Sequence, residues 1–472
     1  MVAELQRALG ADRVLTDPLA TALYAGDAGT DRGRALAVCF PADAGEVAAA
    51  VRALASHGVP FVARGAGTGL AGGAVPPEGG VVIVTTRLNR IHRIDPAERV
   101  AWVEPGVVNL DLTRAAAPFG LHYAPDPSSQ AACTIGGNVG TNAGGPHCLA
   151  AGVTETHVLA LDVVLPDGTV ATFGGPEPDT PGYDLRGVIV GGEGTLGVVT
   201  RIALRLVPDA AARSTMLVAF ASLDAACRTV SAVIAEGIVP GALEMMDRAI
   251  TVAVEDFVGA GFPRDAAAVL LVEIEGAPAA VRADTTAVAE IVAAHGATHV
   301  RTAADAAERD RWWRGRRAAF GAVARVAPDY YLHDTVVPRT RLPEVLAAVV
   351  RIAAAHGLVV MNVFHAGDGN LHPLLVFDGR VPGTWARVRA AGEEIVRTCV
   401  AAGGTLSGEH GIGTEKRDLM PLVCSPEELA LAARLRAAFD PAGLANPGKV
   451  LPTPGRCGEI GALGGCAPGS PR

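Results

Sequence analysis

The stretch Arg64-Gly65-Ala66-Gly67-Thr68-Gly69-Leu70-Ala71-Gly72-Gly73 is the densest glycine segment of the chain and decides the fold of its first half. Positions 67–72 satisfy the G-x-G-x-x-G pattern of Rossmann domains, but that pattern must open a helix and precede an acidic residue by about 20 positions. Here the segment runs into Pro76-Pro77-Glu78-Gly79-Gly80 and then the apolar residues 81–85. The sequence therefore predicts a loop between two strands, whose bare N–H groups can surround an anion while Arg64 adds charge.

Two further glycine-rich runs follow in the first half. Pro125-Asp126-Pro127-Ser128-Ser129-Gln130 precedes the run Thr134-Ile135-Gly136-Gly137-Asn138-Val139-Gly140-Thr141-Asn142-Ala143-Gly144-Gly145, and Gly191-Gly192-Glu193-Gly194-Thr195-Leu196-Gly197 comes later. Loops without bulky side chains let a long ligand lie between backbones, which can contact both its phosphates and its rings. Flavin adenine dinucleotide (FAD) fits three such loops better than a mononucleotide does.

Hydrophobic spacing predicts the elements around these loops. Val47, Val51 and Leu54 recur at helical spacing before Gly58, which predicts a helix over residues 43–57. The turn Pro166-Asp167-Gly168 is typical of a hairpin between two strands. The expected strands of this glycine-rich half are residues 60–63, 81–85, 100–104, 158–165, 169–173 and 198–207.

After Pro208 the pattern changes to strands alternating with alanine-rich helices, typical of an α+β domain. Strands are expected at residues 215–220, 269–276 and 358–364, and helices at 223–238 and 279–294. The Gly- and Pro-rich end is expected to be disordered. We therefore divide the chain into an N-terminal segment of the flavin domain, the flavin domain itself, a substrate and metal domain, and a tail: residues 1–34, 35–209, 210–452 and 453–472.

Residues suited to metal chemistry are concentrated in the second half. His365-Ala366-Gly367-Asp368-Gly369-Asn370-Leu371-His372 places two histidines in a glycine-rich turn, and Gly408-Glu409-His410-Gly411 places a carboxylate beside a third. Imidazole and carboxylate ligands suit a divalent metal, and a spare imidazole can move a proton. The alternative is loop residues with ordinary hydrogen bonds. Five polar residues in two glycine-bracketed turns, in a chain with only 12 histidines, make that alternative the weaker one.

Composition excludes several classes of protein. A net charge of −9 and a pI near 5.8 offer no basic field for nucleic acid or anionic lipid. The first residues carry charges and no apolar run of about 18 residues occurs, so neither a secretory signal nor a membrane span is expected. The eight cysteines are scattered without a C-x-x-C pair, which argues against an iron–sulfur cluster or zinc ribbon and fits a reducing cytoplasm.

Taken in order, the glycine-rich motifs resemble the flavin-binding half of the vanillyl-alcohol oxidase/p-cresol methylhydroxylase (PCMH) superfamily. Motifs of the second half resemble the branch that holds the FAD-binding subunit of glycolate oxidase, D-lactate dehydrogenases and D-2-hydroxyglutarate dehydrogenases. These motifs are Glu244-Met245-Met246-Asp247, Trp313-x-x-Arg316-Arg317, both histidine motifs and Phe439-Asp440-Pro441-x-Gly443-Leu444-x-Asn446-Pro447-Gly448-Lys449. The resemblance covers residues 35–452. It implies an α+β fold with a two-part PCMH-type FAD-binding domain, an α+β substrate (cap) domain and a C-terminal helical segment that returns to the flavin domain.

The resemblance also implies how FAD is bound. The first loop would hold the pyrophosphate, the second the isoalloxazine and ribityl chain, and the third would lie nearer the adenosine. No histidine occurs in the first loop, where covalently flavinylated relatives attach FAD, so we expect non-covalent FAD. The cofactor-binding residues implied are Arg64, Gly65, Ala66, Gly67, Thr68, Gly69, Pro125, Asp126, Thr134, Gly137, Asn138, Gly140, Thr141, Glu193, Gly197, Val199 and Asn446.

The same resemblance implies the catalytic residues. His365, His372 and Glu409 match ligands of a divalent metal (Zn, Mn or Fe), and His410 matches the catalytic base. Arg317 falls where relatives place a clamp for the substrate carboxylate, which a planar guanidinium can bind through two parallel hydrogen bonds. The alternative for Arg317 is a surface charge on an arginine-rich helix.

The chain departs from the family pattern at a few positions. Leu149-Ala150-Ala151-Gly152 stands where relatives usually carry Leu-Lys-Tyr-Gly, and Gly192 replaces the usual Ser. Leu374 stands where some 2-hydroxyglutarate enzymes carry Asn, which favours a small substrate over a diacid.

The resulting hypothesis is metal-assisted oxidation of a D-2-hydroxy acid or glycolate to the 2-oxo acid, with hydride passing to FAD N5 and a proton to His410. Electrons would pass to a separate acceptor, which is a quinone, an electron-transfer flavoprotein or an iron–sulfur partner subunit. The alternatives are a flavin-binding subunit for electron transfer or assembly and, less favoured, a metal-dependent hydrolase. We expect a cytoplasmic protein, or one held at the inner face of the membrane through a partner. It would be a homodimer or hetero-oligomer without nucleic acid.

Overall fold

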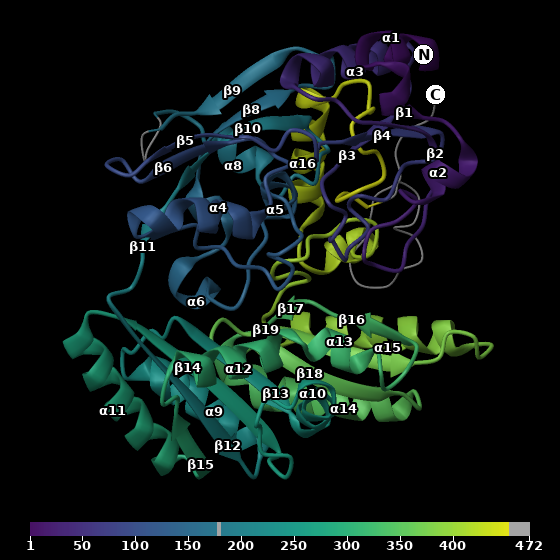
Figure 1. Cartoon of the computed structure of the whole chain (residues 1–472). Helices are drawn as coiled ribbons and strands as arrows, with labels where there is room; N and C mark the ends of the chain where they lie inside the picture. The colour runs from purple at the N-terminus through teal and green to yellow at the C-terminus, as the bar shows by residue number, and fades with distance from the viewer. Residues whose placement is uncertain (177–180, 453–472) are drawn as a thin grey trace.

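The computed structural model describes residues 1–176 and 181–452 and consists of two parts, one above the other in Figure 1. The flavin part contains the N-terminal residues and the C-terminal end of the described chain. The cap part contains the residues between them, and β11 (Val207–Pro208) leads from one part to the other. The tail from residue 453, which we expected to be disordered, lies outside the described residues.

A four-stranded sheet in the order β1-β2-β4-β3 forms one half of the flavin part. Strands β2, β4 and β3 are parallel, and the loop from Arg64 to Gly73 connects β3 to β4, as predicted. Helices α1 and α3 cover the sheet, because Val47, Val51 and Leu54 of α3 are fully buried against it. The bounds are β1 Val14–Leu15, β2 Ala35–Cys39, β3 Phe61–Arg64, β4 Gly80–Val84, α1 Val2–Leu9, α2 Pro18–Ala22 and α3 Ala44–Ser56.

A five-stranded antiparallel sheet in the order β5-β6-β10-β8-β9 forms the other half. The predicted hairpin is confirmed, since β8 pairs with β9 on either side of Pro166-Asp167-Gly168. The bounds are β5 Ile91–Asp95, β6 Val100–Val103, β7 Leu121–His122, β8 Val158–Val164, β9 Val170–Gly174, β10 Val198–Arg205, α4 Asn109–Ala116, α6 Cys148–Ala151, α7 Thr154–His157 and α8 Leu185–Ile189.

The second glycine-rich run departs from our expectation of a loop. Residues Ile135–Thr141 form helix α5, and the Thr134 hydroxyl accepts a hydrogen bond from the Gly137 amide at 3.3 Å. Ile135 and Val139 are fully buried in the core beneath the second sheet. Burial of these two apolar side chains and the threonine cap offset the low helix propensity of glycine.

The cap part is an eight-stranded sheet in which β15-β12-β14-β13-β18-β19-β16 lie in that order and β17 also pairs with β19. Helices α9, α11, α14 and α15 bury apolar residues on one face, and α10, α12 and α13 do so on the other. The bounds are β12 Ala212–Phe220, β13 Ala242–Asp247, β14 Ala268–Gly276, β15 Ala297–Thr302, β16 Asp329–Leu332, β17 Thr335–Val336, β18 Val359–His365, β19 Asn370–Phe377, α9 Leu223–Ala235, α10 Arg248–Val258, α11 Pro278–Ala294, α12 Ala306–Arg317, α13 Ala319–Val323, α14 Leu342–Ala355 and α15 Thr384–Ala401.

The chain returns to the flavin part after the cap part, as the family resemblance implied. Helix α16 (Pro426–Phe439) lies beside the strands of the flavin part in Figure 1. Beyond it, the Phe61 amide donates to the Leu444 carbonyl at 2.9 Å, and Ala445 is buried in the same core as α3. The C-terminal segment is therefore built into the flavin part.

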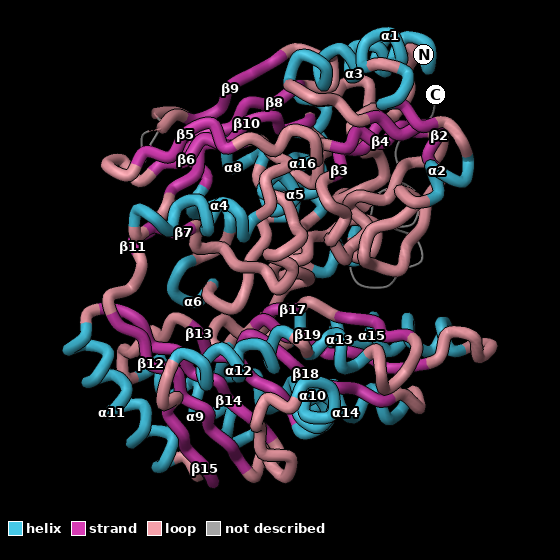
Figure 2. The backbone as a smooth tube through the Cα atoms, in the orientation of Figure 1, coloured by secondary structure: helices cyan, strands magenta, loops and turns pink. Residues whose placement is uncertain are grey.

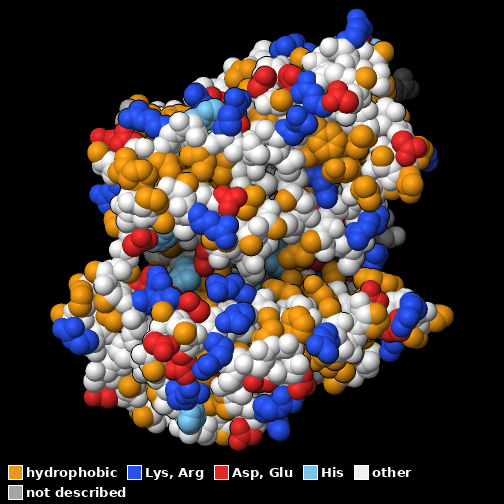
Figure 3. Space-filling model, in the orientation of Figure 1, with side chains coloured by type: hydrophobic (Ala, Val, Ile, Leu, Met, Phe, Trp, Pro, Cys, Tyr) orange, Lys and Arg blue, Asp and Glu red, His pale blue; other side chains and the backbone are white. Residues whose placement is uncertain are grey.

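Loops and turns, rather than sheet faces, form much of the region where the two parts face each other (Figure 2). In the space-filling view the outline narrows there, and histidine side chains are visible at the waist (Figure 3). Among the described residues, no helix combines the length and the apolar character needed to cross a bilayer.

Candidate active site at the junction of the two parts

A cavity of about 570 Å³ lies between the flavin part and the cap part. The glycine-rich segments line it from one side, and Arg317, Phe320, Tyr330, Leu332 and His372 line it from the other, together with Glu409 and His410. The predicted cofactor residues that line it are Arg64, Gly65, Ala66, Gly67, Thr68, Gly69, Thr134, Gly137, Asn138, Gly140, Thr141, Glu193, Gly197 and Val199.

The flavin side of the cavity has the close backbone approach that a bound dinucleotide needs. A Cβ at Gly65 would lie 2.2 Å from the Thr134 hydroxyl, and Gly67 has φ +73° and no room beside the Arg64 guanidinium. Arg64 is almost fully buried and donates to the Gly26 carbonyl at 2.7 Å. Main-chain groups and one anchored cation therefore face the cavity, which fits the phosphates and ring edges of FAD.

Three predicted cofactor residues, Pro125, Asp126 and Asn446, do not line the cavity and instead support segments that do. The Pro125 carbonyl accepts from the Asn109 amide at 2.9 Å, and Asp126 pairs with His147. The fully buried Asn446 side chain donates to the carbonyls of Gly73 and Glu193 at 2.8 and 2.7 Å. Each of the three therefore holds a segment of the cavity wall in place without facing the cavity.

Glu193 has a position that its motif did not indicate. Its carboxylate accepts hydrogen bonds from the amides of Ile412 at 2.6 Å and Gly413 at 2.8 Å. The third glycine-rich loop is thereby joined to the segment that immediately follows His410. Two walls of the cavity that are far apart in sequence meet at this one carboxylate.

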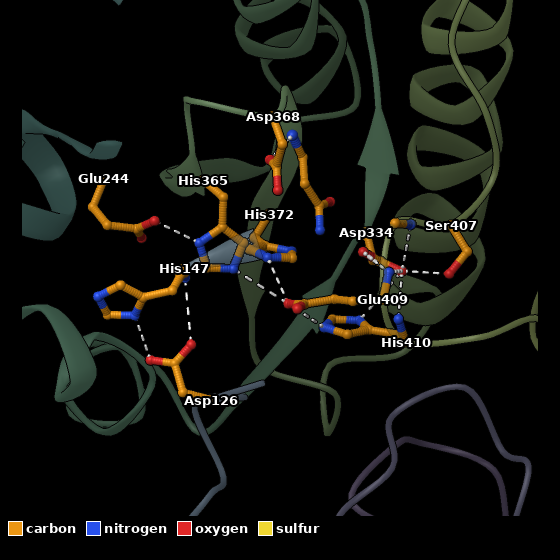
Figure 4. A network of polar contacts seen from close by, with 12 residues as sticks. Asp126, His147, Glu244, Asp334, His365, Asp368, His372, Ser407, Glu409 and His410 are labelled. Carbon is orange, nitrogen blue, oxygen red and sulfur yellow. Dashed lines mark hydrogen bonds and ion pairs between the residues drawn. The ribbon is translucent and has the colours of Figure 1, made fainter. Parts of the chain in front are cut away.

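The predicted metal ligands are brought together by a β-hairpin and a loop. His365 ends β18 and His372 lies within β19, so only residues 366–369 form the turn that we expected to hold both histidines. Gly369 permits this tight turn, because it has φ +81° and a Cβ there would lie 2.1 Å from the Val337 carbonyl. The Glu409 carboxylate lies 3.3 Å from His365 Nε2 and 3.2 Å from His372 Nε2 (Figure 4).

Both histidines are oriented from behind. His365 Nδ1 lies 2.7 Å from the fully buried Glu244 carboxylate, which also pairs with Arg316, and His372 Nδ1 lies 3.2 Å from the His333 carbonyl. Burial opposes the charge on His365, but Glu244 and Glu409 raise its pKa well above the usual value. Each Nε2 is left to face Glu409, which is the arrangement that metal-binding histidines commonly have. His365, His372 and Glu409 thus fit a divalent cation.

A second group of possible ligands, Asp334, His372 and His410, fits a metal less well. Asp334 is fully buried and accepts from the Ser407 hydroxyl at 2.6 Å, the His410 amide at 2.9 Å and Lys416 Nζ at 3.1 Å. These three donors reach Oδ2, and the Glu409 amide reaches Oδ1 at 3.2 Å, so Asp334 holds the loop that carries Glu409 and His410. Neither Asp334 nor Lys416 was identified from the sequence, because each is a single polar residue without a recognisable spacing.

His410 lies at the cavity surface beside His372 and Glu409. Its ring stacks on His372 at 5.2 Å between centroids with an interplanar angle of 7°. Its Nε2 is 3.8 Å from Glu409 and its Nδ1 is 3.9 Å from Asp334. Burial lowers the pKa of His410 to about 4 against the opposing charge of Asp334, so the imidazole is neutral and can accept a proton.

The two adjacent arginines at the end of α12 differ sharply. Arg316 is 1% exposed and pairs with Glu244 behind His365. Arg317 is exposed and lines the cavity, and its guanidinium carbon lies 5.9 Å from the centre of the Trp313 ring. Within residues 1–176 and 181–452, Arg317 forms no ion pair. Its position is that of a group able to bind an anion.

Leu374 does not bear on the substrate. The side chain is fully buried in the core beside α10 and α12 and does not line the cavity. Leu374 therefore gives no evidence on the size of the substrate, since a leucine on the His372 face of β19 can pack inward.

Comparisons with known proteins agree with this geometry. The family described as FAD binding domain matches residues 35–174, and the family described as FAD linked oxidases, C-terminal domain, matches residues 210–450. The glycolate oxidase subunit GlcD of Escherichia coli is 48% identical over 432 residues, covering 92% of this chain and 87% of that protein. A D-lactate dehydrogenase of Archaeoglobus fulgidus is 32% identical, covering 88% of this chain and 91% of that protein.

Solved structures show the same fold at low sequence identity. p-Cresol methylhydroxylase with substrate bound has a TM-score of 0.81 at 17% identity, covering 96% of each chain. The 4-ethylphenol oxidase from Gulosibacter chungangensis has a TM-score of 0.75 at 18% identity, covering 97% of each chain. The protein has the PCMH-type FAD-binding fold, and it belongs to the FAD-linked oxidases.

Proposed function

We propose that the protein oxidises a small 2-hydroxy acid, glycolate or a D-2-hydroxy acid such as D-lactate, to the 2-oxo acid. The observation that carries this proposal is the convergence on one cavity of the glycine-rich loops, Arg317 and the Glu409-His410 pair. In this proposal residues 35–209 bind FAD without a covalent link, and residues 210–452 carry substrate and metal. The names of the relatives, glycolate oxidase subunit and D-lactate dehydrogenase, support the substrate class.

Arg317 would hold the substrate carboxylate. Its guanidinium faces the cavity, and a fork of parallel N–H donors matches the two carboxylate oxygens. With the carboxylate fixed, the hydroxyl-bearing carbon would be held between the glycine-rich loops and the histidines, which lowers the entropic part of the barrier.

His410 would accept the hydroxyl proton. Its neutral ring lies at the cavity surface next to Glu409, and Asp334 fixes the backbone of its loop. His365, His372 and Glu409 would hold a divalent cation (Zn, Mn or Fe) that polarises the hydroxyl, and bound FAD supplies the acceptor for the hydrogen and two electrons that leave the adjacent carbon. The alcohol carbon then becomes the carbonyl of the 2-oxo acid.

The electrons would leave through a separate acceptor. The cysteines in the described part of the chain are all free and come from separate elements, so they form no cluster site there. A quinone, an electron-transfer flavoprotein or an iron–sulfur subunit would serve, and the word subunit in the name of the Escherichia coli relative favours a partner chain. A cytoplasmic location, free or at the membrane through that partner, is part of the same proposal.

Anaerobic bleaching of the flavin by a panel of D- and L-2-hydroxy acids tests the proposal. Glycolate or a D-2-hydroxy acid should bleach it, and Arg317→Met should weaken this response whereas Arg314→Met, an exposed arginine on the same helix, should not. Bleaching by none of the acids would favour an assembly or electron-relay subunit. Acid precipitation should release all FAD into the supernatant.

A further inference from the structure

His147 joins the two parts of the molecule beside the cavity. Its Nδ1 lies 2.7 Å from Asp126 in the flavin part, and its Nε2 lies 3.3 Å from Glu273 on β14 in the cap part (Figure 4 shows the Asp126 side). Asp126 directly precedes Pro127, Ser128 and Ser129, which line the cavity. A ring with a carboxylate at each nitrogen is held best as imidazolium, because both nitrogens then donate.

Glu273 gathers its donors from both sides of the junction. It is 3% exposed, and its carboxylate accepts from the Trp313 indole and from the Thr215 hydroxyl, each at 2.7 Å. Arg213 Nε lies 3.3 Å from the other carboxylate oxygen. A buried carboxylate with this many partners has one well-defined position, and Trp313 is fixed with it.

Trp313 connects this network to Arg317. The His147 ring stacks on the Trp313 ring at 5.4 Å with an interplanar angle of 28°, and the Arg317 guanidinium carbon lies 5.9 Å from the centre of the Trp313 ring. Trp313 and Arg317 both belong to α12 and lie one turn apart, so the indole supports the side chain of the arginine. Within the described residues Arg317 forms no ion pair, and the Trp313 ring is the group that supports its guanidinium.

We propose that His147 is a positioning residue for the reaction: clamped between Asp126 and Glu273, it sets Trp313 and thereby the position of Arg317 relative to the flavin loop. This inference rests on the proposed function, since it takes Arg317 to bind the substrate carboxylate. The His147 network would thus fix the position of Arg317, in the cap part, relative to the loop that follows Asp126 in the flavin part. None of the sequence motifs indicated His147.

The contacts of His147 with Asp126 and Glu273 should weaken at alkaline pH. The charged groups that face His147 are Asp126 from the flavin part, Glu273 and Glu275 from β14, Arg213 from β12 and, more distantly, Glu244 from β13. Burial opposes the charged ring, but Asp126 and Glu273 raise its pKa well above the usual value. The clamp is therefore complete below the ordinary histidine pKa and is lost as the pH rises through the raised one.

His147→Gln tests the proposal, with His122→Gln as the matched control. His122 forms a similar pair with Asp209, at 2.9 Å, but among the described residues it contacts neither Glu273 nor Trp313. In His147→Gln the KM for the hydroxy acid should rise between about 10-fold and 100-fold, with a smaller change in kcat and with FAD content unchanged. The rise in KM at alkaline pH that we expect of the wild type and of the His122→Gln control should be absent in His147→Gln. A KM within twofold of wild type, or a loss confined to FAD affinity, would overturn the assignment.

A double variant separates this inference from the proposed function. If His147 acts through Arg317, adding His147→Gln to Arg317→Met should raise KM no further. Additive effects would contradict the inference and leave the function standing, whereas an Arg317→Met enzyme with normal KM would remove the carboxylate clamp itself. Asp126→Asn keeps the histidine and should reproduce the KM effect in part, and it serves if His147→Gln does not fold.

Discussion

The two walls of the cavity are built on different principles. On the flavin wall, main-chain groups face the ligand, and a Cβ at Gly65 or Gly67 would meet another atom at about 2 Å. On the cap wall, side chains face the cavity, and buried carboxylates hold the groups behind them. Glu244 orients His365, Asp334 accepts from the His410 amide, and Glu273 accepts from the Trp313 indole. The flavin wall depends on glycines, which have no side chain to obstruct a ligand. The cap wall depends on buried residues that hold the cavity-facing side chains in place.

Removing a metal ligand should have the largest effect and should break only the cap wall. We expect His372→Ala, or chelation of the wild type, to abolish turnover because the ligand set loses one imidazole. The protein should stay yellow, since His372 belongs to β19 and the glycine-rich loops to the flavin part. The visible spectrum and turnover with a hydroxy acid, measured on one sample, check both statements. Full activity in metal-stripped enzyme would remove the metal from the mechanism.

Two neighbouring residues on the cap wall should separate proton transfer from metal binding. His410→Ala should slow flavin reduction by about 10²–10⁴-fold, the usual range for a general base, with a smaller effect on substrate affinity. Glu409→Ala should lose metal as well as rate, because its carboxylate lies within 3.3 Å of both histidines. Stopped-flow reduction together with metal analysis distinguishes them. Small and equal effects in both variants would leave His410 without its role.

The flavin wall was the more predictable from sequence. The loop from Arg64 to Gly73 between two strands, the hairpin at Pro166-Asp167-Gly168 and the α3 helix all follow from local patterns of glycine and apolar spacing. The helix over Ile135–Thr141 was missed, because its glycines have low helix propensity. The burial of Ile135 in the folded protein, which stabilises this helix, cannot be seen in the local sequence.

The cap wall was predictable only in its outer layer. The histidine and glutamate motifs indicated residues that meet in the structure, His365, His372 and Glu409, and Arg317 lines the cavity. The residues behind them, Asp334, Lys416 and Glu273, carry no spacing signal, because their partners come from distant parts of the chain. A sequence motif reveals residues at a fixed spacing along the chain, whereas the contacts of Asp334, Lys416 and Glu273 join residues that are brought together only when the chain folds.

Glu193 is where the two walls meet, and it allows their independence to be tested. Glu193→Gln leaves one oxygen to accept from the amides of Ile412 and Gly413 and adds an N–H₂ group beside them. An unsatisfied buried amide costs about 1–3 kcal/mol, so we expect metal affinity to fall by roughly 10-fold and FAD affinity to fall with it. Metal and FAD titrations check this, with the exposed Glu155→Gln as control. Unchanged metal affinity would show that the walls are energetically separate.

The smallest effect is expected on the flavin wall, at Gly65. In Gly65→Ala the new methyl group would lie 2.2 Å from the Thr134 hydroxyl, which caps α5 through the Gly137 amide. Displacing that cap costs about 1 kcal/mol, so thermal stability and FAD affinity should fall modestly while the metal site stays intact. Because the conflict lies with one oxygen atom, Gly65→Ala combined with Thr134→Ala should cost little more than Thr134→Ala alone. Thermal melts and FAD titrations of the three variants check this. Fully additive losses would mean that the methyl group obstructs FAD itself, and the flavin wall would then be a surface shaped directly by its ligand.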